Sequence, residues 1–214
     1  NMDESLKKPI LVVDFGSQYS MLIARRIREL EVYCEVISPT RTIEEIHAMK
    51  PLGVILSGGP ASVYDNNAPT TNVELLKSTL PVLGICYGMQ LMAYQLGGKV
   101  NPSKNQEYGK SYLKIEKNES MLFDGLPSQI DVWMSHADKV ETLPSDFESI
   151  GLSMNSPYAA MANSNKKYGI QFHPEVIHTP MGKEILANFL FKICEADKNW
   201  TPAQFVETTV NQIK

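Results

Sequence analysis

The stretch Gly-Ile-Cys-Tyr-Gly-Met-Gln, residues 84–90, places Cys86 between two glycines directly after an apolar run. Such flanks suit a strained strand-to-helix turn, because glycine lets the backbone bend sharply and approach its neighbours closely. Gly-x-Cys-x-Gly is the thiol counterpart of the nucleophile elbow. The thiol would lie at the N-terminus of the following helix, where the dipole favours thiolate. A Cys-x-Gly by itself is more often part of a core, so both a nucleophile and a buried structural thiol stay open.

A nucleophilic thiol needs a base, and the sequence Phe-His-Pro-Glu at residues 172–175 offers one. His173 follows a predicted strand, and Glu175 stands two residues later. Residues i and i+2 of an extended chain point to the same side, so the Glu175 carboxylate can orient the His173 imidazole. Pro174 keeps the chain between them extended. Cysteine, histidine and a carboxylate are the set that nucleophilic acyl transfer requires.

Acyl transfer also needs hydrogen-bond donors for the anionic tetrahedral intermediate. The backbone N–H of Tyr87, directly after the candidate nucleophile, is one expected donor. The turn Ser-Gly-Gly-Pro at residues 57–60 can bring a second, which we expect at Gly59. This turn is too short for a phosphate-binding P-loop, and by itself it predicts only a change of chain direction.

The bulk composition excludes several function classes. A chain of 214 residues is long enough for one α/β domain and short for two. Its net charge of −4 gives no reason to expect nucleic acid or an acidic membrane as a partner. Its three cysteines form no Cys-x-x-Cys pair, which favours a reducing cytoplasm. Its four histidines show no metal-ligand spacing, so no metal is expected.

Hydrophobic periodicity predicts alternating strands and helices in the first hundred residues and a different pattern after them. Strands are expected at 10–15, 32–38, 52–59 and 81–86, and helices at 20–31, 41–50, 72–79 and 89–98. Short strands are expected at 111–116, 129–136, 139–143, 148–154, 159–164 and 168–173, and a closing helix at 181–196. The predicted fold class is α/β, an open, mostly parallel twisted sheet flanked by helices, with a short mixed or antiparallel extension in the second half.

The three suggestive motifs all lie where predicted strands end. Ligands of open parallel sheets gather outside the carboxyl ends of the strands. Residues 55–60, 84–90 and 171–175 each occupy such a position. This coincidence favours a nucleophile at Cys86 over a core thiol.

These residues resemble the class I (triad) glutamine amidotransferase family, which is characterised by motifs like GICYGMQ and FHPE. Longer phrases resemble the amidotransferase domain of GMP synthetases, namely DFGSQYS, ILSGGPASVYDNNAP, PVLGICYGMQLMA, VWMSHADKVETLP and YGIQFHPEVIHT. The resemblance covers about residues 9–195 and is more specific than the triad alone.

The resemblance implies that Cys86 attacks the side-chain carboxamide of glutamine and that water later releases glutamate from the thioester. His173 would act first as base and then as acid for the departing ammonia, with Glu175 holding it in position. The residues implied to bind the backbone of the substrate glutamine are Gln90 and the loop residues Ser135, His136, Ala137 and Asp138.

The resemblance also implies partners. No cofactor is expected in this domain. Ammonia would pass to an ATP-pyrophosphatase domain or subunit, where ATP and Mg²⁺ support the amination of XMP to GMP. Residues 9–196 would form the amidotransferase domain, and residues 197–214 a linker or helix leading towards that absent domain. Thr201-Pro202 predicts the start of this last helix, with proline at its first position. Separated from its partner, the triad is expected to be misaligned, because unregulated hydrolysis would waste glutamine.

Two positions depart from the family pattern. Ala137 stands where the family usually has glycine, and a positive φ there would cost alanine about 1 kcal/mol. Gln106 stands where the family has arginine, which removes a charge but touches none of the expected chemistry.

Three other functions stay open. The chain could serve another acceptor, as in anthranilate, carbamoyl phosphate or CTP synthesis, but DFGSQYS and VWMSHADKV belong to the GMP branch. It could be a γ-glutamyl hydrolase that needs no partner. It could also be a non-catalytic glutamine-sensing or docking module, which the complete triad disfavours. Dependence on a synthetase partner separates the expected function from the last two.

Overall fold

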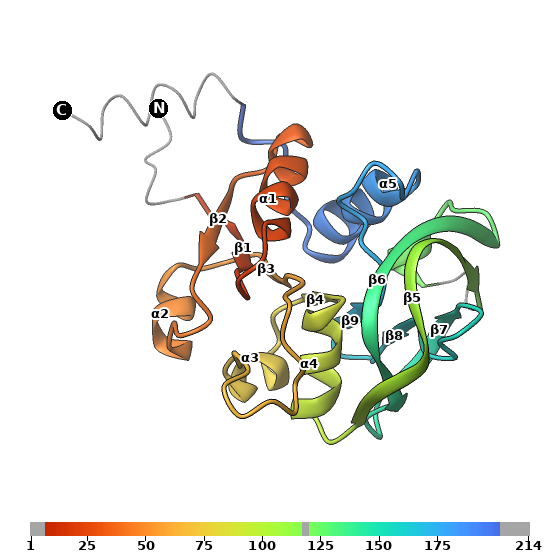
Figure 1. Ribbon diagram of the computed structural model, residues 1–214. Coiled ribbons are helices and arrows are strands. Elements are labelled where there is room, and N and C mark those ends of the chain that lie inside the picture. The colour runs from red at the N-terminus through yellow and green to blue at the C-terminus, as the bar shows by residue number, and fades with distance from the viewer. Residues whose placement is uncertain (1–6, 117–119, 202–214) are drawn as a thin grey trace.

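One sheet runs through the whole molecule. The computed structural model describes residues 7–116 and 120–201, and its nine strands follow the order β2-β1-β3-β4-β9-β8-β7-β5-β6 (Figure 1). The first five strands in this order pair in parallel. They are β2 (Cys34–Ile37), β1 (Ile10–Val13), β3 (Gly53–Leu56), β4 (Val82–Ile85) and β9 (Lys167–Ile170).

Helices cover both faces of the parallel part, as its almost continuously apolar strands require. Side chains of β1 alternate between the two layers, so that Ile10 and Val12 face one and Leu11 and Val13 the other. The first layer contains α1 (Tyr19–Glu29), α5 (Gly182–Ala187) and the π-helical segment η3 (Asn188–Ile193). The second contains α2 (Ile43–Ala48), α3 (Val73–Lys77) and α4 (Tyr87–Gln95) (Figure 1).

The remaining strands are antiparallel and end in a long, curved ribbon (Figure 1). They are β8 (Ala160–Ala162), β7 (Glu148–Leu152), β5 (Lys99–Ile115) and β6 (Gln129–Thr142). A short 3₁₀ helix, η2 (Met121–Phe123), lies between β5 and β6 in sequence. The predicted α/β fold class is confirmed, and the antiparallel part is longer than expected.

Two expected strands, 129–136 and 139–143, are in fact one strand, β6. Its side chains alternate between buried and more exposed along nearly its whole length, because it pairs with β5 almost throughout. The expected strand 111–116 is only the end of β5, which begins at Lys99. The first part of β5 is polar and contains Pro102, so its sequence does not predict a strand. The register of its pairing with β6 shifts between Pro102 and Glu107. Pairing with β6 nevertheless holds this part extended.

The chain after η3 runs back to α1. Trp200 is buried, and its backbone N–H donates to the carbonyl oxygen of Glu31 at 3.0 Å. The helix predicted from Thr201-Pro202 onward lies outside the described residues. Among the described helices, none combines the length and the apolar character needed to cross a membrane.

Candidate active site

Cys86 lies on the tight turn predicted between β4 and α4. Its φ of 54° and ψ of −108° are unusual for a residue with a Cβ atom and store of order 1–3 kcal/mol of strain. A Cβ on Gly88 would lie 2.2 Å from the carbonyl oxygen of Leu56, and one on Gly84 would lie 2.7 Å from the backbone of Gly88. Both glycines are therefore required by the close approach of α4 to β3 and β4.

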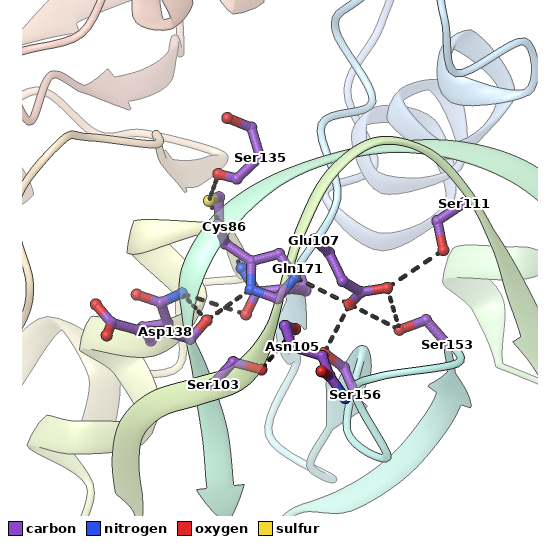
Figure 2. Close-up of polar contacts among 12 residues, drawn as sticks. Cys86, Ser103, Asn105, Glu107, Ser111, Ser135, Asp138, Ser153, Ser156 and Gln171 are labelled. Carbon is purple, nitrogen blue, oxygen red and sulfur yellow. Dashed lines mark hydrogen bonds and ion pairs between the residues drawn. The ribbon is translucent and has the colours of Figure 1, made fainter.

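Among the described residues, Ser135 and Gln171 form hydrogen bonds with the Cys86 sulfur. The thiol donates to the carbonyl oxygen of Ser135 at 3.5 Å, a contact drawn in Figure 2. The side-chain amide of Gln171 donates to the sulfur at 3.6 Å. Gln171 is thus a further contact of the candidate nucleophile.

His173 and Glu175 are buried and joined by a hydrogen bond of 2.6 Å between Nδ1 and Oε1. The other Glu175 oxygen, Oε2, has no hydrogen-bond partner among the described residues, so His173 compensates this buried charge. Burial by itself lowers the pKa of His173, but hydrogen bonds with Cys86 and Glu175 outweigh it. The pKa of His173 therefore lies well above its ordinary value.

The position of Cys86 relative to His173 bears on the expected misalignment. Both side chains line the same cavity and lie next to Gly58. The misalignment expected for the isolated chain stays a prediction. Two contacts from α1 hold His173 and Glu175 in place. Tyr19 packs its ring against the imidazole of His173, with centroids 4.7 Å apart, and Arg26 Nε donates to the carbonyl oxygen of Glu175 at 2.8 Å.

A cavity of about 560 Å³ opens in front of Cys86 and His173. This is an ordinary size for a small-molecule site. Glu175 lies behind His173 and does not line the cavity. The structure brings together every other residue predicted for the site, since the cavity is lined by Gly59, Tyr87, Gln90, Ser135, His136, Ala137 and Asp138.

The two predicted oxyanion donors, Gly59 and Tyr87, both line this cavity, and their role stays a prediction. Gly58 lies even closer to the triad. A Cβ there would lie 3.0 Å from Cε1 of His173 and 3.8 Å from Cβ of Cys86. The absence of a side chain at Gly58 thus makes room for the imidazole.

The segment from Ser135 to Asp138 is part of strand β6, and the expectation of a loop is wrong. Ala137 has no positive φ, so the cost considered for alanine at this position does not arise. The Asp138 carboxylate accepts hydrogen bonds from the hydroxyls of Ser62 at 2.6 Å and Tyr64 at 2.5 Å. Its side chain therefore anchors the turn after β3. Gln106 is exposed.

Sequence reasoning missed three residues of the site: Gln171, Tyr19 and Glu107. Gln171 could have been considered, because it stands only two residues before His173, just after β9 ends at Ile170. The position of Tyr19 depends on how α1 packs across the sheet. Glu107 is brought to His136 by strand pairing, which no local pattern indicates.

Replacing Glu175 by glutamine is expected to lower the pKa of His173. Glutamine keeps the size and a hydrogen-bond acceptor but lacks the negative charge that favours the imidazolium. NMR titration of ring nitrogens labelled with ¹⁵N measures the change, and the signals of exposed His47 on α2 serve as an internal control. An unchanged His173 titration would show that the carboxylate does not hold its proton.

The family model for class-I glutamine amidotransferases matches residues 11–193. Over 209 residues the chain is 53% identical to the glutamine-hydrolyzing GMP synthase of Aquifex aeolicus, covering 97% of the chain and 41% of that protein. It is 48% identical to the enzyme of that name from Dehalococcoides mccartyi, covering 100% of the chain and 40% of that protein. The chain thus spans about two fifths of the length of these curated relatives.

Solved structures agree. A Thermoplasma acidophilum protein, provisionally described as one of the subunits of a GMP synthase, aligns with a TM-score of 0.76 at 30% identity over 95% of this chain and 98% of that one. A glutamine amidotransferase of Thermotoga maritima aligns with a TM-score of 0.72 at 20% identity over 88% of this chain and 98% of that one, which shows the shared fold. The chain belongs to the class-I glutamine amidotransferase family.

Proposed function

We propose that this chain is the glutaminase part of a glutamine-hydrolysing GMP synthase. The observation that carries the proposal is that Cys86 and His173 line one cavity sized for a small molecule, with Glu175 hydrogen-bonded to His173 behind it. The curated relatives support the choice of acceptor, because two GMP synthases match nearly the whole chain.

In the proposed mechanism the Cys86 thiolate attacks the carboxamide carbon of glutamine. The negative charge that develops on the carbonyl oxygen is stabilised by the backbone N–H groups of Gly59 and Tyr87. His173 takes the thiol proton of Cys86 as base and then gives it to the departing nitrogen, which leaves as ammonia. His173 then takes a proton from water, which attacks the thioester and releases glutamate. Glu175 stabilises the imidazolium each time it forms.

We further propose that Gln90 and residues 135–138 hold the backbone of the substrate glutamine, because all of them line the cavity next to Cys86. The released ammonia would be used by an ATP-pyrophosphatase domain or subunit that aminates XMP to GMP. ATP and Mg²⁺ would be bound by that partner and not by this domain. Such a coupled enzyme of purine synthesis would work in the cytoplasm.

The test measures glutamate released from glutamine by this chain, alone and with the part of the Aquifex aeolicus relative that this chain does not match. ATP, Mg²⁺ and XMP are added in separate steps. We expect release by the chain alone and a rise of about tenfold with the partner and all three substrates, a usual size for coupling between sites. GMP should form in step with glutamate.

Two outcomes would contradict the proposal. Strong release that ignores the partner, without GMP, would indicate a free-standing γ-glutamyl hydrolase or another acceptor. No release under any condition would favour a docking or sensing module.

A further inference from the structure

We propose that Glu107 is a positioning residue of the active site. It pairs with an imidazolium at His136 and thereby fixes residues 135–138 of β6, which line the cavity and contact the Cys86 sulfur. The expected effect of Glu107 on kinetics rests on the function proposed above. The expected protonation of His136 does not depend on that function.

Glu107 lies on β5 directly opposite His136 on β6, and both side chains are buried. The Glu107 carboxylate accepts a hydrogen bond from His136 Nε2 at 3.1 Å. Three serine hydroxyls complete its surroundings, as Figure 2 shows: Ser156 at 3.0 Å, Ser153 at 3.1 and 3.3 Å, and Ser111 at 3.3 Å. A buried carboxylate needs donors and a positive partner, and the serine hydroxyls and His136 occupy these places.

The charge of Glu107 follows from these contacts. Burial raises the pKa of its carboxyl, but hydrogen bonds from His136, Ser156 and Ser153 lower it further, so the net pKa lies below the ordinary value. Glu107 is therefore ionised and can only accept hydrogen bonds.

The second ring nitrogen of His136 also faces an acceptor. Nδ1 lies 2.6 Å from the carbonyl oxygen of Asp138, which cannot donate. Because Nε2 faces an ionised carboxylate and Nδ1 faces a carbonyl, both nitrogens must carry hydrogen. His136 is thus an imidazolium paired with Glu107, and a neutral ring would leave one of these two contacts without a proton.

From the Asp138 carbonyl the hydrogen bonds continue to the nucleophile. This oxygen also accepts a bond from Gln90 Nε2 at 3.1 Å, and the same nitrogen donates to Gln171 Oε1 at 3.3 Å. Since both amide hydrogens of Gln90 point to oxygen atoms, Gln171 must turn its own amide nitrogen towards Cys86. The hydrogen bonds thus form a series from the Glu107 carboxylate to the Cys86 sulfur. The carboxylate at the start of this series sets the orientation of the groups that follow.

These contacts explain why an ion pair is buried beside the cavity. Residues 135–138 line the cavity, and the Ser135 carbonyl contacts the Cys86 thiol. The pairing of β5 with β6 is irregular here, because its register shifts between Pro102 and Glu107. Backbone hydrogen bonds between the strands therefore do not fix this part of the ribbon by themselves. The pair holds the Asp138 carbonyl at the place where the regular ladder is interrupted.

The first test observes His136 directly. The ring ¹⁵N signals are recorded at neutral pH in the unmodified chain, in Glu107→Gln and in Glu116→Gln, and His136 is assigned from its loss in His136→Asn. Glu116 is the matched control, because it also accepts a serine hydrogen bond, from Ser149 at 2.6 Å, but is exposed. We expect two protonated nitrogens in the unmodified chain and in the control, and one in Glu107→Gln. A neutral His136 ring in the unmodified chain would overturn the proposal, whether or not the chain hydrolyses glutamine.

The second test separates positioning from simple stability. In Glu107→Gln we expect the KM for glutamine to rise about tenfold while kcat changes by less than about threefold, because binding groups move and the triad stays. Thermal unfolding of the same samples checks that the variant is folded. An unchanged KM in a folded Glu107→Gln protein would overturn the positioning role. Absence of hydrolysis in the unmodified chain would instead contradict the proposed function and leave the NMR result to decide.

Discussion

Replacement of Cys86 by alanine is expected to lower glutamine hydrolysis by at least about four orders of magnitude and to leave the fold intact. The expected loss is this large because removal of a nucleophile removes the covalent route altogether, not one stabilising contact. Alanine accepts the strained backbone at this position no worse than cysteine does, since both carry a Cβ atom. Glutamate release measures the activity, and circular dichroism with thermal unfolding measures the fold.

Cys34→Ala is the matched control. Cys34 is also a buried thiol, it donates to the carbonyl oxygen of Ala24 at 3.6 Å, and neither residue lines the cavity. This variant should lose about 1 kcal/mol of stability and keep its activity. Retained hydrolysis in Cys86→Ala would show that the thiol is a core residue and that the nucleophile lies elsewhere.

Gly88→Ala is expected to cost at least about 3 kcal/mol of folding free energy, enough to unfold many domains of this size. The new Cβ would lie 2.2 Å from the carbonyl oxygen and 2.7 Å from the Cβ atom of Leu56. Leu56 belongs to the central strand β3, whose backbone cannot retreat without breaking its pairing with β1 and β4. Urea unfolding gives the change in free energy.

Gly97→Ala separates crowding from backbone conformation. Gly97 has a φ of +97°, but nothing lies within 4 Å of a Cβ placed there. Alanine at this position should therefore cost only about 1 kcal/mol. Equal losses in Gly88→Ala and Gly97→Ala would mean that α4 shifts to accommodate a methyl group, and the close packing of the elbow would not be needed for stability.

Much of the parallel half of the sheet could be predicted from sequence alone. Each of its strands is a short apolar run, and α1, α2 and α4 carry an apolar stripe or clear end signals, so local periodicity contains the information. The turn at Cys86 could be predicted for the same reason, because its glycines are adjacent in sequence. The contact between His173 and Glu175 joins residues only two positions apart, although the chain there bends after β9 and is not extended as expected.

The antiparallel half depended on contacts that are distant in sequence. The first part of β5 is polar and contains Pro102, and only its pairing with β6 makes it a strand. The same pairing joins two expected strands into β6 and turns the expected loop at residues 135–138 into a cavity wall.

The sequence by itself thus determined the fold class, the elbow and the three triad residues, since each is encoded within a few neighbouring positions, and the family resemblance pointed to Gln90 and residues 135–138 of the cavity wall. Only the tertiary structure decided which groups orient them. Tyr19 reaches His173 across the sheet, Gln171 meets the sulfur of Cys86, and Glu107 meets His136 from the neighbouring strand. The physical reason is that a buried polar group takes its partner from whatever the packing brings within hydrogen-bond distance, and sequence separation does not limit that choice.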